Sequence, residues 1–440
     1  MTATEKANRY TEISRKYGDP WIWGIYITLI IISIIESYSA SSQQVTSMGV
    51  YEPIIKQCVH LLMGAVCLIL ISRTDYNRSR FLYIMIPGLA LVTIVTLVYV
   101  FFAGDVVNGA QRVMQLPGFT LQPAELAKLS IVTLLSYILA KSQRNKDVSN
   151  GGIIASAIAV SIYGGLLIRS GLTNAVLLMC ISLSMLVMGG AQFKKVGYLI
   201  IFYIVLAGGY GLIQSHNSKT DKQLNQAKTE MNIVTGEDST PVVNRGEMRE
   251  GRIKAWWNND SLVYRPITDQ NQQEMFSRMA QAHGGLPGCG IGKSRECSRL
   301  PLAFSDFIYS IIVEETGLVG GIFVLLLYLS LLGRAAMIVR RSKRVLPSLL
   351  VIGMASFITY QALFHMAINV GVFPVSGQTL PLISKGGTSI IVISIAFGVM
   401  LSVSRTIANY NNKDTKVDNT EIIDGLDAEN PIELPKNIWK

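Results

Sequence analysis

The sequence has little charge. Of its 440 residues, 15% are Asp, Glu, Lys or Arg and half are apolar, a balance that excludes an ordinary soluble domain. Several apolar runs, such as 81–102 and 307–332, are long enough to cross a hydrocarbon core, which takes about 20 helical residues. Because lipid leaves the edges of an open sheet unsatisfied, these runs predict helices. The class indicated is a helical membrane protein with many spans.

The sequence also lacks a concentrated basic face. Its formal net charge is +10, but Lys and Arg lie in short loops between alternate apolar runs, which argues against nucleic acid as a partner. Basic residues cluster before the first span and after the second, fourth, sixth and eighth, whereas 42–53 has none. This alternation predicts an even number of spans with both termini in the cytoplasm.

We predict ten spans in one membrane domain, 21–404, between a cytoplasmic N-terminus, 1–20, and a disordered cytoplasmic tail, 405–440. The ten spans are Trp21 to Ser41, Ile54 to Ser72, Phe81 to Ala103, Ala124 to Ala140, Ile153 to Ile168, Leu172 to Met188, Val196 to Ser215, Asp306 to Leu332, Leu346 to Val370 and Thr388 to Ser404. A large extracytoplasmic loop occupies 216–305, and we expect its stretch 218–243, which has no aromatic residue, to be mobile.

Two alternatives affect this topology. The first span is preceded by basic residues and followed by small ones, as in a cleaved signal peptide, although the span count works without cleavage. Arg169, Ser170 and Gly171 interrupt an apolar stretch and predict a tight outer turn. Reading that stretch as one kinked helix would invert everything downstream, and the later basic loops argue against it.

Histidine and cysteine are scarce, with four and five copies. His60 and His365 lie alone in apolar runs, and no paired metal-ligand spacing accompanies them, so we predict no built-in metal site. Cys289 and Cys297 lie close together in the outer loop, where an oxidising compartment could join them. We expect them to be near enough to crosslink, and the alternative is two free thiols.

A glycine cluster at 284–294 resembles a phosphate-binding loop. It lacks the nucleotide-binding pattern, because Pro287 occupies the place of the glycine five positions before Gly292, Lys293 and Ser294. Two readings stay open: a flexible backbone turn that approaches a diphosphate or sugar, and an ordinary tight turn.

Asp306 stands at the predicted start of the eighth span. Aspartate there can simply cap the helix, or it can act chemically. Glu314 lies eight residues on, loosely on the same side and about 12 Å further along the helix, and ionisable residues within spans are functional candidates. Glu315 points to the opposite side, so the Glu314–Glu315 pair cannot serve one site together.

Four further charged residues are candidates for a binding site at the outer face, where the positive ones could meet an anionic ligand. Glu125 and Lys128 follow Pro123, three residues apart and so adjacent on a helix, and capping at a proline-started helix is their structural alternative. Arg112, in the preceding outer loop, and Lys385, between the last two predicted spans, are positive groups that could instead contact lipid headgroups.

Three stretches together resemble the FtsW and RodA family of shape, elongation, division and sporulation proteins. The stretches are VNGAQR at 107–112 with LQPAELAK at 121–128, the segment from Gly284 through SDFI at 305–308 to EETGLVG at 314–320, and NVGVFPVSGQTLPLISKGGTS at 369–389. The end of the first span (residues 38–42) and the sequence GQTLP at 377–381 are more similar to the division branch of this family than to its elongation branch. Two departures stand out: Lys385 replaces a usual aromatic residue, and the region 169–175 differs from the family pattern.

This resemblance implies an all-α, ten-transmembrane-helix bundle with one large extracytoplasmic loop in the bacterial inner membrane. It also implies a peptidoglycan glycosyltransferase that polymerises lipid II with inversion. Asp306 would be the catalytic base, with Arg112, Glu125, Lys128, Glu314 and Lys385 as substrate-binding candidates. No cofactor is built in, although a divalent cation, Mg²⁺ or Mn²⁺, is allowed.

Implied partners are lipid II, a class B penicillin-binding transpeptidase, other divisome proteins and membrane lipid, without nucleic acid. The alternatives are a flippase that moves lipid II across the bilayer, a side-wall polymerase of the elongation branch, and a division scaffold without activity.

Overall fold

The computed structural model describes residues 3–41, 52–74, 79–107, 110–116, 119–144, 147–206, 208–209, 256, 267–268, 271–342 and 344–413. Its long helices are α1 (Ala3–Tyr17), α2 (Pro20–Ser41), α4 (Glu52–Arg73), α5 (Ser79–Ala103), α6 (Pro123–Lys141), α7 (Asn150–Ser170), α8 (Leu172–Met188), α11 (Gln272–Gly284), α12 (Ile308–Val339), α13 (Val345–Asn369) and α14 (Gly387–Lys413). Residues 193–206 are also helical. The expectations for 218–243 and for 414–440 lie outside the described residues, whereas 405–413, predicted as disordered tail, is the last part of α14.

The predicted spans fall on helices. Within the described residues, eight helices are long and apolar enough to cross a membrane, and α8 is a shorter apolar helix. The remaining predicted span, 196–215, is helical as far as residue 206. The predicted break is confirmed, because α7 ends at Ser170, α8 begins at Leu172 and Gly171 caps both. An all-α, multi-pass membrane protein is the observed class.

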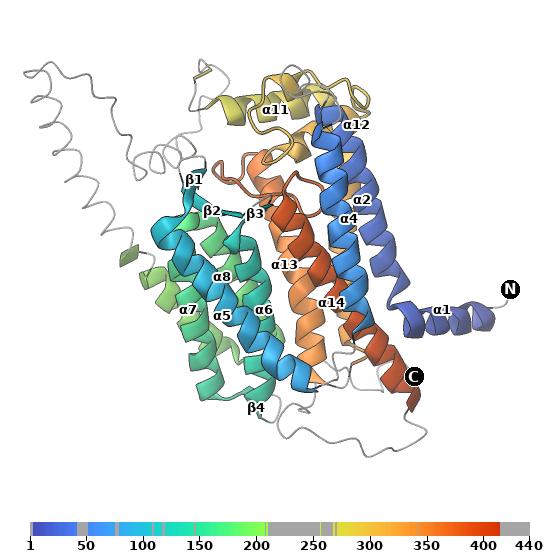
Figure 1. The fold of residues 1–440 in the computed structure, drawn as a ribbon, viewed down its shortest axis with the longest axis vertical. Helices are drawn as coiled ribbons and strands as arrows, with labels where there is room; N and C mark the ends of the chain where they lie inside the picture. Colours follow the sequence, from blue (N-terminus) through green and yellow to red (C-terminus); the bar gives the residue numbers. More distant parts are fainter. Residues whose placement is uncertain are drawn as a thin grey trace, which may run out of the picture.

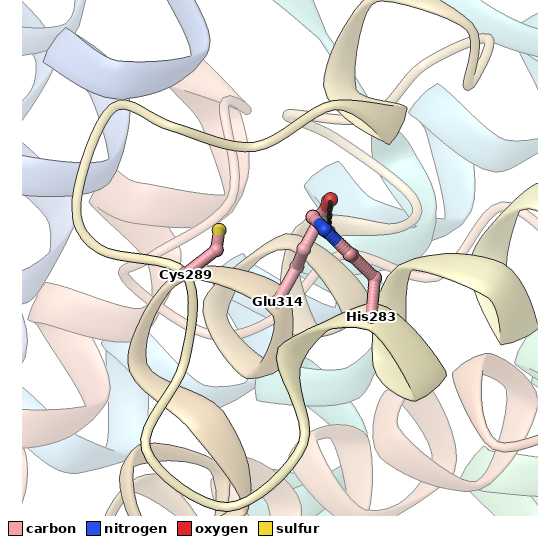
Figure 2. A group of neighbouring side chains, drawn as sticks. All are labelled: His283, Cys289 and Glu314. Carbon is pink, nitrogen blue, oxygen red and sulfur yellow. Dashed lines mark hydrogen bonds and ion pairs between the residues drawn. The ribbon is translucent and has the colours of Figure 1, made fainter.

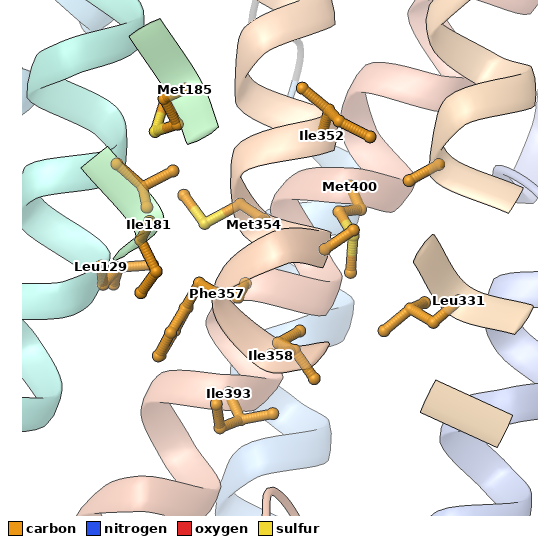
Figure 3. Packing of buried hydrophobic residues seen from close by; sticks show 14 of the residues in the cluster. Leu129, Ile181, Met185, Leu331, Ile352, Met354, Phe357, Ile358, Ile393 and Met400 are labelled. Atoms are coloured by element: carbon orange, nitrogen blue, oxygen red, sulfur yellow. The ribbon is translucent and has the colours of Figure 1, made fainter. Parts of the chain in front are cut away.

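The bundle is centred on α13, which packs against α6, α8, α12 and α14. Its buried residues include Ile352, Met354, Phe357 and Ile358, and the apolar side chains that surround them come from α6, α8, α12 and α14 (Figure 3). In contrast, α5 and α7 expose large apolar side chains such as Leu91 and Ile154. Such exposed apolar faces suit contact with lipid.

Two small sheets mark opposite ends of the bundle (Figure 1). Strands β1 (Asp105–Val107), β2 (Ala110–Leu116) and β3 (Phe119–Leu121) form an antiparallel sheet at the end that also carries α11, which we call the outer end. Strands β4 (Gln143–Arg144) and β5 (Asp147–Val148) pair at the other end, where α1 and the end of α14 lie. The described termini therefore share one end, as an even number of spans requires.

Helix α12 is interrupted at Gly317, where φ is 73° and ψ is −175°. The glycine cluster docks into this kink: Cys289 N donates to Glu314 O (3.0 Å) and Gly290 N donates to Glu315 O (2.9 Å). In the opposite direction, Leu318 N donates to Gly285 O (2.9 Å). The helix carbonyls freed by the kink are thus satisfied by the loop, as a buried backbone requires.

Glycine is needed at this docking site because two backbones touch. A Cβ on Gly288 would lie 2.2 Å from Glu315 O, and one on Gly317 would lie 2.0 Å from Leu286 O. The cluster is therefore a tight structural turn against α12. This contact supports the turn reading and gives the glycines a packing role that the diphosphate reading did not anticipate.

We predict that Gly317→Ala destabilises the protein by about 2 kcal/mol or more, because alanine disfavours positive φ and its methyl overlaps the loop. Gly333→Ala is the matched control on the same helix, since a Cβ there meets nothing within 4 Å and alanine favours helix. Thermal unfolding in detergent measures both. Equal midpoints for the two variants would contradict the docking described here.

Candidate active site

Asp306 lies in a turn just before α12 and is half-buried. Its Oδ1 accepts a hydrogen bond from Ser305 Oγ (2.9 Å), its N–H donates to Leu302 O (3.0 Å), and its carbonyl accepts from Asn369 Nδ2 (3.1 Å). The predicted helix start at Asp306 is two residues early. The N-cap is Phe307, without a side-chain cap, so Asp306 does not occupy the N-cap position.

The segment that carries Lys385 lies against this turn. Lys385 N donates to Phe304 O (3.0 Å), and Ser384 Oγ donates to Ser305 O (2.7 Å). The Lys385 ammonium sits 5.1 Å from the centre of the Phe304 ring, a cation–π contact. The structure therefore brings a fixed carboxylate and a lysine onto neighbouring segments at the outer end.

The outer sheet joins the same region. Thr388 Oγ1 donates to Thr120 O (2.5 Å) and accepts from Gln122 N (3.3 Å), which connects β3 and the start of α6 to the start of α14. Strand β2, which contains Arg112, pairs with β3. The side chain of Arg112 lies outside the described residues, so its contact with an anionic ligand stays a prediction.

Lys128 is fully enclosed in the bundle. Its Nζ donates to Glu125 Oε1 and to Gln361 Oε1, both at 2.7 Å, and lies 5.7 Å from the centre of the Phe357 ring. The side chain of Lys128 is 0% exposed, and Glu125 is buried beside it. The expected pairing with Glu125 is present, and direct contact with a diphosphate stays a prediction that requires this part of the bundle to open.

A row of polar side chains on α13, which we call the polar track, connects the Lys128–Glu125 pair with the Asp306 turn. Gln361, His365 and Asn369 are spaced by four residues and so share one face of the helix. Gln361 binds Lys128 at one end of the track and Asn369 binds the Asp306 carbonyl at the other. Among the described residues, Glu125 Oε2, His365 Nε2 and Gln378 Oε1 are buried without a hydrogen-bond partner. Sequence reasoning missed Gln361 and Asn369, because neither is charged.

Glu314 faces the outer loop. Its carboxylate accepts from Ser294 Oγ (2.5 Å) and Arg295 N (2.9 Å), and it is 2.8 Å from His283 Nδ1. These bonds hold the Glu314 carboxylate against the loop, and the side shared with Asp306 stays a prediction. Substrate binding by Glu314 stays a prediction. Glu315 points the other way, toward α2, where Ser39 donates to it.

Cys289 and Cys297 are both free thiols in the structure, and that they lie near enough to crosslink stays a prediction. Cys297 is buried in a small apolar cluster with Leu300, Ala303, Phe307 and Ile311. Burial, together with the nearby carboxylates of the Glu315 and Glu314 side chains, raises the pKa of the Cys297 thiol to about 12.

The geometry defines a class: a polytopic helical membrane protein with a fixed carboxylate and a lysine at its outer end and a buried ion pair deeper in the bundle. The family described as "Cell cycle protein", with FtsW, RodA and SpoVE as namesakes, matches residues 20–409. The chain belongs to this family, which confirms the resemblance drawn from the motifs.

Named relatives agree with this assignment. The "Probable peptidoglycan glycosyltransferase FtsW" of Geobacter metallireducens is 27% identical over 383 residues, covering 86% of this chain and 92% of the relative. The protein with the same name in Bacillus subtilis is 27% identical over 364 residues, covering 82% and 83%. Stage V sporulation protein E of Bacillus subtilis is 26% identical over 352 residues, covering 80% and 86%.

Solved structures share the fold. The Thermus thermophilus rod shape determining protein RodA aligns with a TM-score of 0.59 and 21% identity, over 88% of this chain and 97% of that one. A chain from a peptidoglycan synthase complex, described as coordinating polymerization and crosslinking, aligns with a TM-score of 0.63 and 21% identity, over 89% and 98%. At this identity the likeness establishes the architecture.

We predict that Lys128→Met alone destabilises the protein by about 3–5 kcal/mol, because it leaves the Glu125 carboxylate buried without its cation. Adding Glu125→Gln should recover much of that loss, because both charges are then gone. Thermal unfolding of the two single variants and the double variant measures the coupling. Additive losses would contradict an ion pair shielded from solvent.

We predict that Cys297 resists alkylation in the folded protein at neutral pH. A thiol with a raised pKa keeps its proton, so the reactive thiolate forms only as the pH approaches about 12. A variant that retains Cys297 as its one cysteine should react slowly with iodoacetamide until denaturant is added. A matched variant whose one cysteine is placed at the neighbouring exposed loop position by Ser298→Cys controls for reagent access, and equal rates would contradict the buried environment.

Proposed function

We propose that this protein is a peptidoglycan glycosyltransferase that polymerises lipid II into glycan strands during cell division. Family membership and the named FtsW relatives support the reaction class. The observation that carries the proposal for this chain is the placement of Asp306, next to the segment that carries Lys385. Its half-buried carboxylate accepts a hydrogen bond from Ser305, and two further bonds hold its backbone.

The reaction needs a base and a positive field. The 4-hydroxyl of one sugar attacks the anomeric carbon of the other, the hydroxyl proton leaves, and the bond to the diphosphate breaks with inversion. Asp306 accepts the proton in our proposal, a role worth roughly a hundredfold to ten-thousandfold. Its turn is held by Asn369 and Leu302, so the carboxylate keeps its position during proton transfer.

The leaving diphosphate carries the charge that must be stabilised. Lys385 is joined to the Asp306 turn by the backbone bond from its N–H to Phe304 O, and we assign it to the diphosphate together with Arg112. We assign Lys128 and Glu125 to a deeper position, where Gln361 and the rest of the α13 track connect them to the Asp306 turn.

A divalent cation could be held between Asp306 and the substrate in this mechanism. Mg²⁺ is usually held by one or two carboxylates together with substrate phosphates rather than by an all-protein cage. Asp306 and the substrate diphosphate match that donor set, and a cation held there would add positive charge at the leaving group.

Orientation and partners complete the proposal. The described termini lie at the end opposite α11 (Figure 1), which together with the positive-inside pattern supports a cytoplasmic location for that end and an inner-membrane location for the protein.

The neighbouring structure described as a peptidoglycan synthase complex supports a transpeptidase partner. We propose a class B penicillin-binding protein and other divisome proteins for this role.

We predict that Asp306→Asn folds and binds lipid II while polymerisation falls by about a hundredfold or more, because asparagine keeps the size but cannot accept the proton. The measurement is glycan-strand formation from lipid II by purified protein in detergent, with binding measured separately. Glu274→Gln is the matched control, because Glu274 is an outer-end carboxylate paired with Arg278 on α11. A fully active Asp306→Asn protein would sink the proposed base.

A further inference from the structure

Three donor side chains meet at the outer loop. His283 is in the last turn of α11, Cys289 is in the glycine turn, and Glu314 is in α12 (Figure 2). The imidazole nitrogen, the thiol sulfur and a carboxylate oxygen all lie within 4.8 Å of one another. The closest pair is His283 Nδ1 and Glu314 Oε1, at 2.8 Å.

We propose that His283, Cys289 and Glu314 bind a zinc ion. Imidazole, thiolate and carboxylate are the donors that zinc takes in proteins, and three protein ligands with water in a fourth position form a common tetrahedral arrangement. Thiolate and imidazole disfavour Mg²⁺, which prefers oxygen ligands. The ligands of this site therefore differ from those of any Mg²⁺ site at Asp306. The zinc proposal does not depend on the proposed glycosyltransferase activity.

The distances require little rearrangement. In a tetrahedral zinc site with bonds of about 2.0–2.2 Å to nitrogen and oxygen, those two atoms lie about 3.4 Å apart. The observed 2.8 Å separation would open by about 0.6 Å as the ion replaces the proton between Nδ1 and Oε1. Binding requires an unprotonated Nδ1, which neutral His283 provides as its Nε2–H tautomer, and an ionised Cys289, whose thiol proton passes to solvent.

The backbone around the ligands is already fixed. Gly284 and Gly288 pack directly on the α12 backbone, so neither His283 nor Cys289 can drift away from Glu314. Arg295 N and Ser294 Oγ hold the Glu314 carboxylate in orientation. Such supporting bonds are characteristic of metal ligands. His283 is 33% exposed, which gives an ion a way in.

The surroundings favour a cation. The Glu314 and Glu315 carboxylates lie near the Cys289 sulfur, so a thiolate here needs a positive partner. Bound zinc would provide it and would tie α11 and the glycine turn to α12. Ser277 of α11 also donates to the Asn369 carbonyl of α13 (2.9 Å). The ion would therefore hold α11, α12 and α13 more firmly together next to the Asp306 turn.

Cobalt gives a direct test, because Co²⁺ takes the same ligands and its bond to a thiolate produces a charge-transfer absorption band. Full-length protein in detergent is stripped with a chelator, dialysed and titrated with Co²⁺, and Zn²⁺ is then added in competition. We expect one Co²⁺ per chain, a thiolate band, displacement of cobalt by zinc, and no displacement by millimolar Mg²⁺. A wild-type titration without a thiolate band overturns the proposal.

Two variants test which residues bind. Cys289→Ser should abolish the band and weaken zinc binding by about a hundredfold or more, since even supporting residues cost 10–100-fold. Cys297→Ser is the control, because this neighbouring loop cysteine is outside the donor group and should leave the band intact. A band that survives Cys289→Ser overturns the proposal.

Zinc should also raise the thermal unfolding midpoint of the wild type and of Cys297→Ser, because an ion that binds only the folded state stabilises it. It should not raise the midpoint of Cys289→Ser or His283→Gln. An equal rise in all four proteins would show that zinc binds elsewhere and would overturn the proposal. Polymerisation by the zinc-free wild type reports on the glycosyltransferase separately.

Discussion

The outer end of the molecule depends on one buried amide. Asn369 Nδ2 donates to the carbonyls of Asp306 and His365, and its Oδ1 accepts from Ser310 N and Ser310 Oγ. The Asn369 carbonyl accepts from Ser277 and Gln281 of α11. In an apolar surrounding each unmade bond would cost about 1–3 kcal/mol, so this residue fixes α11, α12 and α13 together, and with them the position of Asp306.

The need of buried polar groups for hydrogen-bond partners also explains the polar track that runs along α13 from Asn369 to Gln361. A buried ammonium is tolerated only when it is paired and hydrogen-bonded, and Lys128 has both Glu125 and Gln361. Gln361 in turn donates to Thr379, which lies in the segment that leads to Lys385. A chain of hydrogen-bonded polar groups, with a few buried atoms left unpaired, thus runs through a bundle whose other buried positions are mostly apolar. Such chains are costly inside a membrane protein, which marks them as functional candidates.

Much of the fold could be predicted from the sequence, because span length and charge alternation are local signals. The apolar runs located the helices, and Gly171 located the turn between α7 and α8. The α12 kink escaped prediction, because a glycine at 317 in an apolar run gives no sign that a loop will dock there. Helix α1 and the short strands also escaped, since neither carries a membrane signal.

The candidate site was predictable only in part. Asp306 stood out through its place in a motif, and Glu125 and Lys128 through their spacing. Contacts between distant parts of the chain have no local signature: Lys128 meets Gln361 across 233 residues. The loop partners of Glu314 were missed because the docking of residues 283–295 against α12 has no local signature. His283, Cys289 and Glu314 were not read as a donor group, because their spacings of 6 and 25 residues match no metal motif.

The central proposal for this protein is that the Asp306 carboxylate at the outer end supports the polymerisation of a lipid-linked sugar. The most direct measurement incubates the purified wild-type protein in detergent with lipid II as the sole substrate and resolves the products by length. Glycan strands should form without any other enzyme. Lipid II that stays monomeric, while the same protein moves it between the leaflets of vesicles, would contradict the account and identify a transporter.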